Sequence, residues 1–227
     1  MNSGDQLRAN LQVLINTYRD LLSEIDTWFE TCQQSAPPGM LACRKGCSAC
    51  CRGLFDITLL DAFLLREGFA HLPVDVQEQV LERCRPRLSE LQQRWLQLTN
   101  PYLLNDLPDD SWTAMPEGDE TPCPLLGADG LCLVYPFRPM TCRLHGLPNL
   151  DRSGEDFSTD LCTLHPGDPL TLTETVLRWP FRDTFNREIA LLRAFTLQLT
   201  GTPTSEADTF IALALLADYG CFVRSKE

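Results

Sequence analysis

Apolar residues recur at alternating steps of four and three along the first part of the chain. The stripe consists of Leu7, Leu11, Leu14, Tyr18, Leu21, Ile25 and Trp28. Because an α-helix has 3.6 residues per turn, this spacing places the stripe on one face of an amphipathic helix. The helix is expected to end before Pro37 and Pro38. The pattern therefore predicts an N-terminal helix within residues 1–36.

The middle of the chain carries two further helical patterns. Thr58 and Asp61 have the spacing of a capping box, and the apolar run that follows them stops at Gly68. A second stripe begins after Pro73 and consists of Val76, Val80, Cys84, Leu88, Leu91, Trp95 and Leu98. It should be kinked or split at Pro86, because proline lacks the amide hydrogen that a helix interior uses. We predict a short helix and a longer, interrupted one.

The C-terminal part repeats the helical spacing. Thr171 and Glu174 form a capping pattern before a stripe that is expected to bend near Pro180. The members of this stripe are Leu177, Phe181, Phe185, Ile189, Leu192 and Leu199. Ser205 and Asp208 form a similar pattern and should start the last helix.

Two segments between these helices are irregular. Residues 101–124 are rich in proline and acidic residues, which favours a loop. Its acidic part, from Asp106 to Glu120, is either a solvated loop or a docking surface for a basic partner. Further on, the pair Asp129 and Gly130 stands between two short apolar runs, which is typical of a β-hairpin turn.

These elements predict a mainly α fold, with helices packed around an irregular cysteine-rich middle and at most a small β-hairpin. The length of 227 residues suits one domain, and the sequence contains no internal repeat. We therefore expect a single domain over 1–227. It would comprise the N-terminal helix (1–36), a metal-binding region (43–162) and C-terminal helices (170–221).

The charge of the chain narrows the choice of partners. It carries 19 Lys and Arg against 31 Asp and Glu, a formal net charge of −12. Such a charge disfavours nucleic acid and anionic membrane surfaces as partners. The first twenty residues mix charged and apolar positions, unlike a signal peptide, and no segment has the apolar length of a membrane span. We expect a cytoplasmic protein.

Eleven cysteines in a reducing compartment are seldom a disulfide framework, and the usual reason for such a number is metal binding or catalysis. Four of them stand in the segment "CRKGCSACC", residues 43–51. Its CxxxCxxC spacing is found in radical S-adenosylmethionine enzymes, but those need a parallel α/β barrel, and no alternation of strands and helices follows here.

The adjacent pair Cys50 and Cys51 indicates more than one metal, because neighbouring side chains diverge and seldom bind the same ion. Four more candidate ligands follow in turn-like settings. The eight candidates are Cys43, Cys47, Cys50, Cys51, Cys123, Cys132, Cys142 and Cys162. Eight thiolates suit two four-cysteine cluster sites, two zinc sites or one larger cluster, and we favour two sites built from both halves.

Other residues near these cysteines are candidates for supporting roles. Basic residues crowd the cysteines, and they either lower the thiol pKa values and stabilise an anionic cluster or pair with the acidic surface. They are Arg44, Lys45, Arg52, Arg138 and Arg143, of which the last two are the stronger functional candidates. Tyr135 is expected to pack beside the site and exclude water, whereas Phe137 suits ordinary core packing.

The remaining histidines and cysteines have weaker claims. His145 and His165 follow Cys142 and Cys162 by three positions, so either histidine could replace a cysteine ligand or make ordinary hydrogen bonds. Three cysteines have no partner spacing and are interpreted as buried thiols. These are Cys32, Cys84 and Cys221.

The segments "CRKGCSACC" and "CPLLGADGLCLVYPFRPMTCR" together resemble the CxxCxxCC cysteine-cluster family, described as zinc- or iron-chelating domains. The resemblance covers about residues 43–162 and implies a metal or iron–sulfur site. One departure is that three residues, not two, separate Cys43 from Cys47.

Three functions remain open. The first is an iron–sulfur protein, with [4Fe-4S] clusters, that transfers electrons or serves as a redox accessory to a partner enzyme. The second is a metal-cluster enzyme, because flagellin lysine methylases carry a similar cysteine cluster. The third is a structural zinc protein. All-cysteine ligation suits zinc and iron–sulfur alike, but paired CxxC knuckles of a zinc ribbon are absent from the sequence. We therefore favour iron–sulfur.

Overall fold

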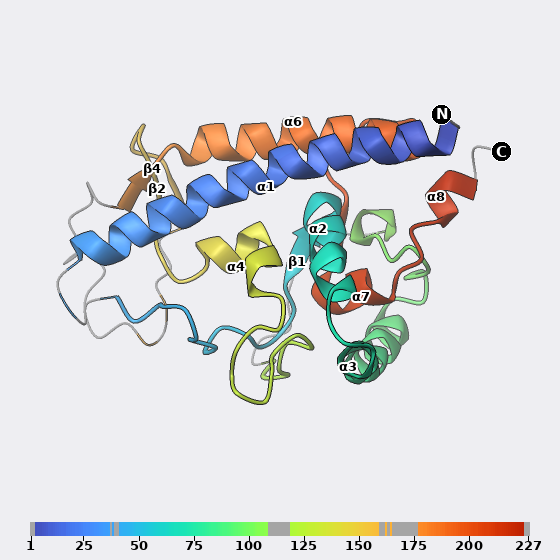
Figure 1. Cartoon of the computed structure of the whole chain (residues 1–227), viewed down its shortest axis with the longest axis horizontal. Coiled ribbons are helices and arrows are strands. Elements are labelled where there is room, and N and C mark those ends of the chain that lie inside the picture. Colours follow the sequence, from blue (N-terminus) through green and yellow to red (C-terminus); the bar gives the residue numbers. More distant parts are fainter. Residues whose placement is uncertain are drawn as a thin grey trace.

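The computed structural model describes residues 3–36, 38, 41–108, 119–158, 162, 164 and 177–224. Two long helices, α1 (Ser3–Ser35) and α6 (Phe181–Thr200), lie side by side and run in opposite directions (Figure 1). The amphipathic stripe predicted for the N-terminal helix is confirmed, since Tyr18, Ile25 and Trp28 are all buried. This helix pair forms one wall of the molecule, and the other elements pack against it.

Helix α2 (Leu59–Ala70) begins at the predicted cap. The side chain of Thr58 accepts a hydrogen bond from the backbone N–H of Asp61. The helix does not stop at Gly68, as the sequence suggested, but continues for two more residues. Gly68 instead gives room to Phe137, since a Cβ at this glycine would lie 2.5 Å from the ring.

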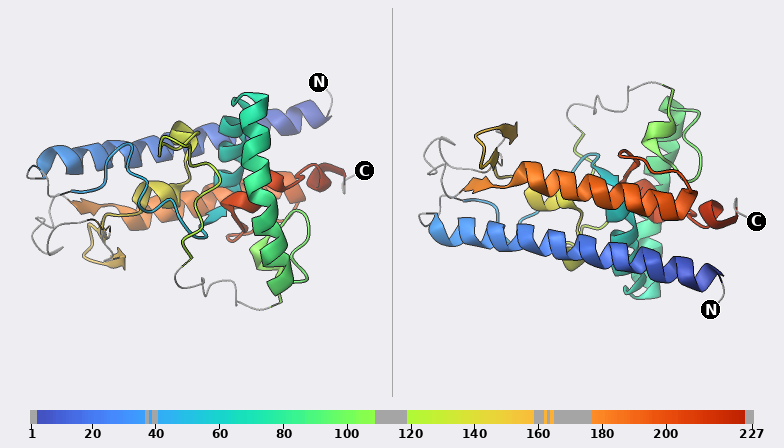
Figure 2. Two further views of the ribbon diagram at one scale, coloured as in Figure 1. Left: turned by 90° about the horizontal axis from the view of Figure 1, so that it is seen from below. Right: turned by 90° about the horizontal axis from the view of Figure 1, so that it is seen from above.

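Helix α3 (Val74–Arg94) is continuous through Pro86, so the predicted split of this helix is wrong. The helix ends at Arg94, and the ring of the next residue, Trp95, stacks against Phe210 at a centroid distance of 6.3 Å. In the described part of the irregular segment that follows, a short 3₁₀ turn, η1 (Leu104–Asp106), adds Leu104 to the same apolar cluster. Figure 2 shows that α3 lies crosswise to α1 and α6.

The start of the long C-terminal helix differs from the prediction. Residues Arg178–Trp179 form a short strand, β4, and α6 begins only after Pro180. Proline therefore starts this helix instead of bending it, because its missing N–H has no helical partner at a helix start. The predicted capping residues Thr171 and Glu174 lie outside the described residues.

The last predicted helix also begins later than expected. Asp208 belongs to a strand, β5 (Asp208–Phe210), so its interpretation as a cap residue is wrong. The strand fixes this carboxylate beside Asn105, which donates to it at 3.1 Å. Two short helices follow, α7 (Ile211–Leu216) and α8 (Cys221–Arg224).

Two small sheets join distant parts of the chain. Strand β1 (Asp56–Thr58) pairs antiparallel with β5. Strand β2 (Asn149–Asp151) pairs antiparallel with β3 (Asp156–Ser158) and parallel with β4. The predicted hairpin is reduced to a tight turn with a single bridge between Leu126 and Cys132.

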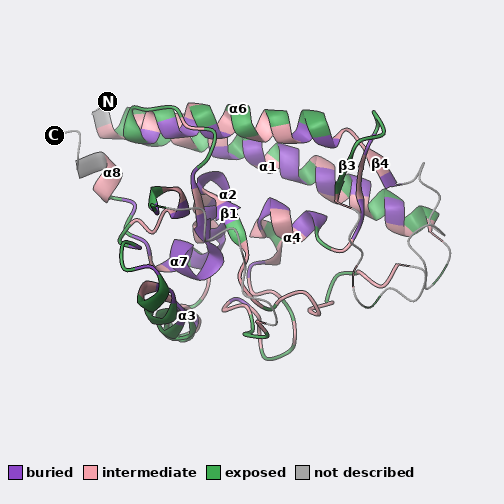
Figure 3. Cartoon of the chain, turned by 180° about the vertical axis from the view of Figure 1, so that it is seen from behind, coloured by how far each residue is buried: buried purple, intermediate pink, exposed green. Residues whose placement is uncertain are grey.

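The fold is mainly α with small β elements, as the sequence predicted. Helix α4 (Met140–Leu144) lies beneath α1, and the cysteine-bearing segments pass below it on the side away from the long helices (Figure 1). Figure 3 shows buried residues on the facing sides of the helices and intermediate burial along these segments. Among the described helices, none combines the length and apolar character needed to cross a membrane.

Candidate metal centre

The two cysteine-bearing segments are held together by backbone pairing. The N–H of Cys123 donates to the carbonyl of Cys51 at 2.9 Å, and the N–H of Gly53 donates to Thr121 at 2.8 Å. Arg52 and Pro122 form an isolated β-bridge between these two hydrogen bonds. The end of the first segment therefore lies directly beside the start of the second.

Seven of the eight predicted ligands line one cavity of about 100 Å³. They are Cys43, Cys47, Cys50, Cys51, Cys123, Cys132 and Cys142. The eighth, Cys162, lies next to the first of them across Gly146, where an added Cβ would be 3.4 Å from Cys162 Cβ and 3.7 Å from Cys43 Sγ. Gly146, which lies between Cys43 and Cys162, has a φ of 96°, and this backbone conformation favours glycine.

The thiols form two neighbouring groups. Burial raises the pKa of Cys43 to about 11, and three nearby thiols raise it further: Cys50, Cys47 and Cys162. Burial likewise raises the pKa of Cys142, which is affected by the thiols of Cys123, Cys132 and Cys50. One group thus contains Cys43, Cys47 and Cys162, and the other contains Cys123, Cys132 and Cys142. Cys50 lies close to both groups. Among the described residues, no three His, Cys, Asp or Glu side chains converge closely enough to hold a single metal ion.

The pair Cys50 and Cys51 lies at the junction of these groups. A hydrogen bond with Cys51, together with burial, raises the pKa of Cys50. The two side chains thus contact each other and line the same cavity, so the expectation that they diverge is wrong. Their position still allows each of them to complete a different group.

The expected effect of the basic residues on the thiols is outweighed by burial. Burial raises the pKa of Cys123 to about 11 and also raises that of Cys132. Arg138 opposes this increase at Cys132 and at Cys43 but does not reverse it. Without metal, the thiols of Cys43, Cys123 and Cys132 are therefore protonated at neutral pH, and metal binding to them must release protons.

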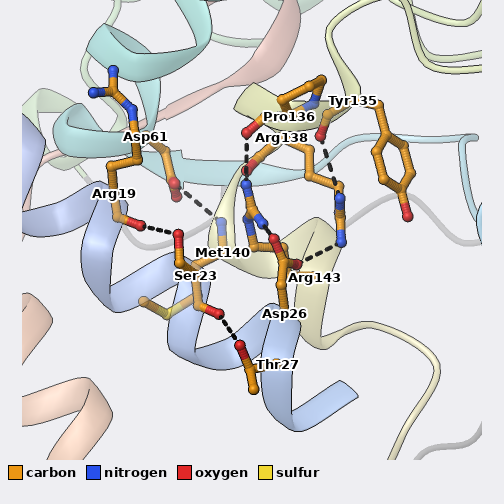
Figure 4. A network of polar contacts seen from close by, with 10 residues as sticks. All are labelled: Arg19, Ser23, Asp26, Thr27, Asp61, Tyr135, Pro136, Arg138, Met140 and Arg143. Atoms are coloured by element: carbon orange, nitrogen blue, oxygen red, sulfur yellow. Dashed lines mark hydrogen bonds and ion pairs between the residues drawn. The ribbon is translucent and has the colours of Figure 1, made fainter. Parts of the chain in front are cut away.

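Arg138 and Arg143 line the cavity and meet at one carboxylate on α1 (Figure 4). Arg138 Nη2 donates to Asp26 Oδ1 at 2.7 Å, and Arg143 Nη1 pairs with Asp26 Oδ2. Tyr135 also lines the cavity, with its ring centroid 4.0 Å from the Arg138 guanidinium. Arg138 and Arg143, the two arginines predicted as functional, thus lie at the cysteine cavity and also form ion pairs with Asp26.

Of the other basic residues near the cysteines, some lie at or beside the cavity and one pairs with the acidic surface. Arg44 is exposed and lines the cavity. Lys45 Nζ lies 5.5 Å from the ring centroid of Tyr135. Arg52 is an exposed partner of Glu120 at 3.7 Å and does not line the cavity. Arg52 therefore fits ordinary surface pairing.

The weaker candidates are placed as follows. His145 lines the cysteine cavity, and its ring lies 5.6 Å from that of Phe55, whereas His165 falls outside the described residues. Cys32 and Cys84 are buried, as expected. Cys221 is only half-buried, so its interpretation as a buried thiol is wrong. Phe137 packs against α2, in line with a packing role.

A second, acidic cavity lies beside the first, and the sequence gave no local signal for it. It has a volume of about 360 Å³ and shares His145 with the cysteine cavity. Its carboxylates come from β1, α2, α6 and β5: Asp56, Asp61, Glu188 and Asp208. These residues stand far apart in the sequence, and only the packing of the elements brings them together.

One tyrosine hydroxyl joins two of these acids. Tyr18 Oη lies 2.8 Å from Asp61 Oδ1 and 3.0 Å from Glu188 Oε1. A hydroxyl has a single hydrogen, so one contact is satisfied when a carboxyl keeps its own proton. Burial, and then the charge of Asp61, raise the pKa of Glu188 to about 8. Glu188 is therefore the carboxyl that keeps its proton at neutral pH.

This arrangement predicts a pH-dependent stability. The folded state holds a proton on Glu188 that the unfolded state loses near pH 4.5, so the free energy of unfolding should fall as pH rises from 4.5 to about 8. We expect Glu188→Gln to remove on the order of 5 kcal/mol of this decrease in the free energy of unfolding. Urea unfolding of both proteins across this pH range measures it. Equal slopes for the two proteins would contradict the assignment of the proton.

A family model described as "CxxCxxCC: Putative zinc- or iron-chelating domain" matches residues 42–162. The match begins one residue before the first cysteine of the cavity and ends at Cys162. It leaves out all of α1 and all of α6. Comparisons with curated proteins and with solved structures found no match.

Proposed function

Because the chain belongs to the CxxCxxCC family of zinc- or iron-chelating domains, we propose that its metal is iron, bound as [4Fe-4S] clusters in the cysteine cavity. The observation that carries this proposal is the number of thiols, since seven cysteines line a single cavity. Two tetrahedral zinc ions would use the same number of ligands, but the paired CxxC knuckles of a zinc ribbon are absent from the sequence, which favours iron. Clusters held by four cysteines each would employ the whole set together with Cys162.

The distribution of the thiols supports two sites. One group comprises Cys43, Cys47 and Cys162, and the other comprises Cys123, Cys132 and Cys142. Each group has three members, and the pair between them supplies one more for each. In this arrangement Cys50 and Cys51 complete different clusters, and the metal centre uses all eight cysteines.

Electron transfer, or a redox accessory role toward a partner protein in the cytoplasm, is the activity that follows for clusters with only cysteine ligands. Surface charge supports a docking position. Arg44 and Lys45 are exposed beside the cavity in a chain of net charge −12. A partner with an acidic surface would be steered electrostatically to Arg44 and Lys45. Binding there would keep the distance for electron transfer to the clusters short.

A metal-cluster enzyme is the second candidate, and the acidic cavity favours it. The cavity lies next to the thiols and is lined by carboxylates, which attract a cationic group such as a lysine side chain. A flagellin lysine methylase acts on such a side chain. This candidate requires an iron without a fourth cysteine, where the substrate or a cofactor would bind.

Anaerobic purification followed by metal and sulfide analysis tests the proposal. We expect a brown protein with iron and acid-labile sulfide in equal amounts, and an absorption band that bleaches on reduction. A colourless protein with zinc and no sulfide would refute it in favour of a structural zinc site. A change in the electron paramagnetic resonance signal on adding a cofactor would favour the enzyme.

A further inference from the structure

Asp26 lies on α1, outside residues 42–162, yet it joins the two arginines of the cysteine cavity. Each of its carboxylate oxygens pairs with a different arginine, Oδ1 with Arg138 and Oδ2 with Arg143 (Figure 4). The side chains of these arginines are 15% and 4% exposed. The side chain of Asp26 is 36% exposed, so water is excluded mainly on the side of the arginines, and the charge-assisted hydrogen bonds orient both guanidinium groups.

Backbone carbonyls fix the rest of the Arg143 guanidinium. Its Nε donates to the carbonyl of Arg138 at 3.0 Å, and Nη2 donates to the carbonyl of Pro136 at 2.9 Å. Arg143 therefore ties the turn that carries Tyr135 to the helix that carries Cys142. Asp26 is the carboxylate that accepts from the remaining nitrogen, so it anchors this arrangement to α1.

Arg138 provides the electrostatic connection to the thiols. Its guanidinium lies over the ring of Tyr135, and its Nη1 donates to the carbonyl of the same residue at 3.3 Å. These contacts keep the positive charge at the cavity, where it is close enough to affect Cys43 and Cys132. The carboxylate of Asp26 neutralises part of that charge.

We propose that Asp26 is a positioning residue of the metal centre, which orients Arg138 and Arg143 toward the thiolates and sets the net positive charge that the cluster experiences. The inference rests on the proposed function for the identity of the cluster. Without the carboxylate charge, two cations face the thiolates instead of one net cation. The more negative, reduced state of a cluster is then favoured.

The test compares Asp26→Asn with Asp26→Glu and with Glu30→Gln, which removes an exposed acid one turn further along α1. Asparagine keeps a hydrogen-bond acceptor but loses the charge. We expect Asp26→Asn to retain its iron and sulfide and to shift the reduction potential to a more positive value. Asp26→Glu should return the potential toward the wild-type value, and Glu30→Gln should leave it unchanged.

The two hypotheses fail in different ways. Iron and sulfide in the wild-type protein decide the proposed function before any variant is compared. If the chain holds zinc, the same variants are compared by chelator competition, and Asp26→Asn should bind zinc severalfold more tightly because thiolates are better stabilised. For either metal, an Asp26→Asn effect no larger than that of Glu30→Gln overturns the role of Asp26.

Discussion

Replacing Cys51 with serine is expected to remove about half of the bound metal and leave the rest in place. The reason is its position beside Cys50, where two groups of three thiols meet. One site loses its fourth ligand, while the other keeps its own three thiols and Cys50. Iron, zinc and sulfide per chain, measured on anaerobically purified protein, give the result directly.

Cys84→Ser is the matched control. Cys84 is buried on α3, and its pKa is raised by burial and by the nearby thiol of Cys123, but it does not line the cavity. We expect its metal content to equal that of the wild type. Full metal content in Cys51→Ser would refute the two-site arrangement, and complete loss would indicate one cluster shared by all the cysteines.

The helices were predictable because their signal is local. The periodicity of apolar residues and the capping pair Thr58 and Asp61 identify α1 and α2 without any tertiary information. The strands were not predictable, since β1 pairs with β5 about 150 residues away and each has only three residues. The spacing of Ser205 and Asp208 suits a helix cap, yet Asp208 lies in a strand. Only the pairing of this strand with the distant β1 decides between the two structures.

Part of the metal centre was likewise predictable from the sequence, and part depends on packing. The spacing of the first four cysteines and the turn-like settings of the later ones were sufficient to name the thiols that line the cavity, and positive charge nearby identified Arg138 and Arg143. Spacing could not show that burial dominates the thiol pKa values, because burial depends on packing. Nor did any local pattern identify Asp26 or Glu188, whose roles arise only when α1 and α6 pack over the cysteine-rich middle.

Gly68→Ala is expected to destabilise the fold strongly, although alanine normally favours a helix. The added Cβ would lie 2.5, 2.6 and 2.7 Å from Cγ, Cδ2 and Cβ of Phe137. Because the clash includes the Cβ of Phe137, rotating the ring does not relieve it, and the 3₁₀ turn η3 (Tyr135–Phe137) must shift. Overpacking of this kind costs about 1–3 kcal/mol, more than the roughly 1 kcal/mol gained in helix propensity.

The same substitution should also affect the metal centre, because the displaced turn carries Tyr135 at the cysteine cavity. A double-mutant cycle with Phe137→Ala separates the clash from other effects. Phe137→Ala removes Cγ and Cδ2, two of the three atoms in the clash, so the double variant should be less destabilised than the sum of the single variants. Urea unfolding of the four proteins measures this coupling, and metal content per chain follows the cavity. Additive losses would show that the contact between Gly68 and Phe137 does not determine the packing of α2 against the site.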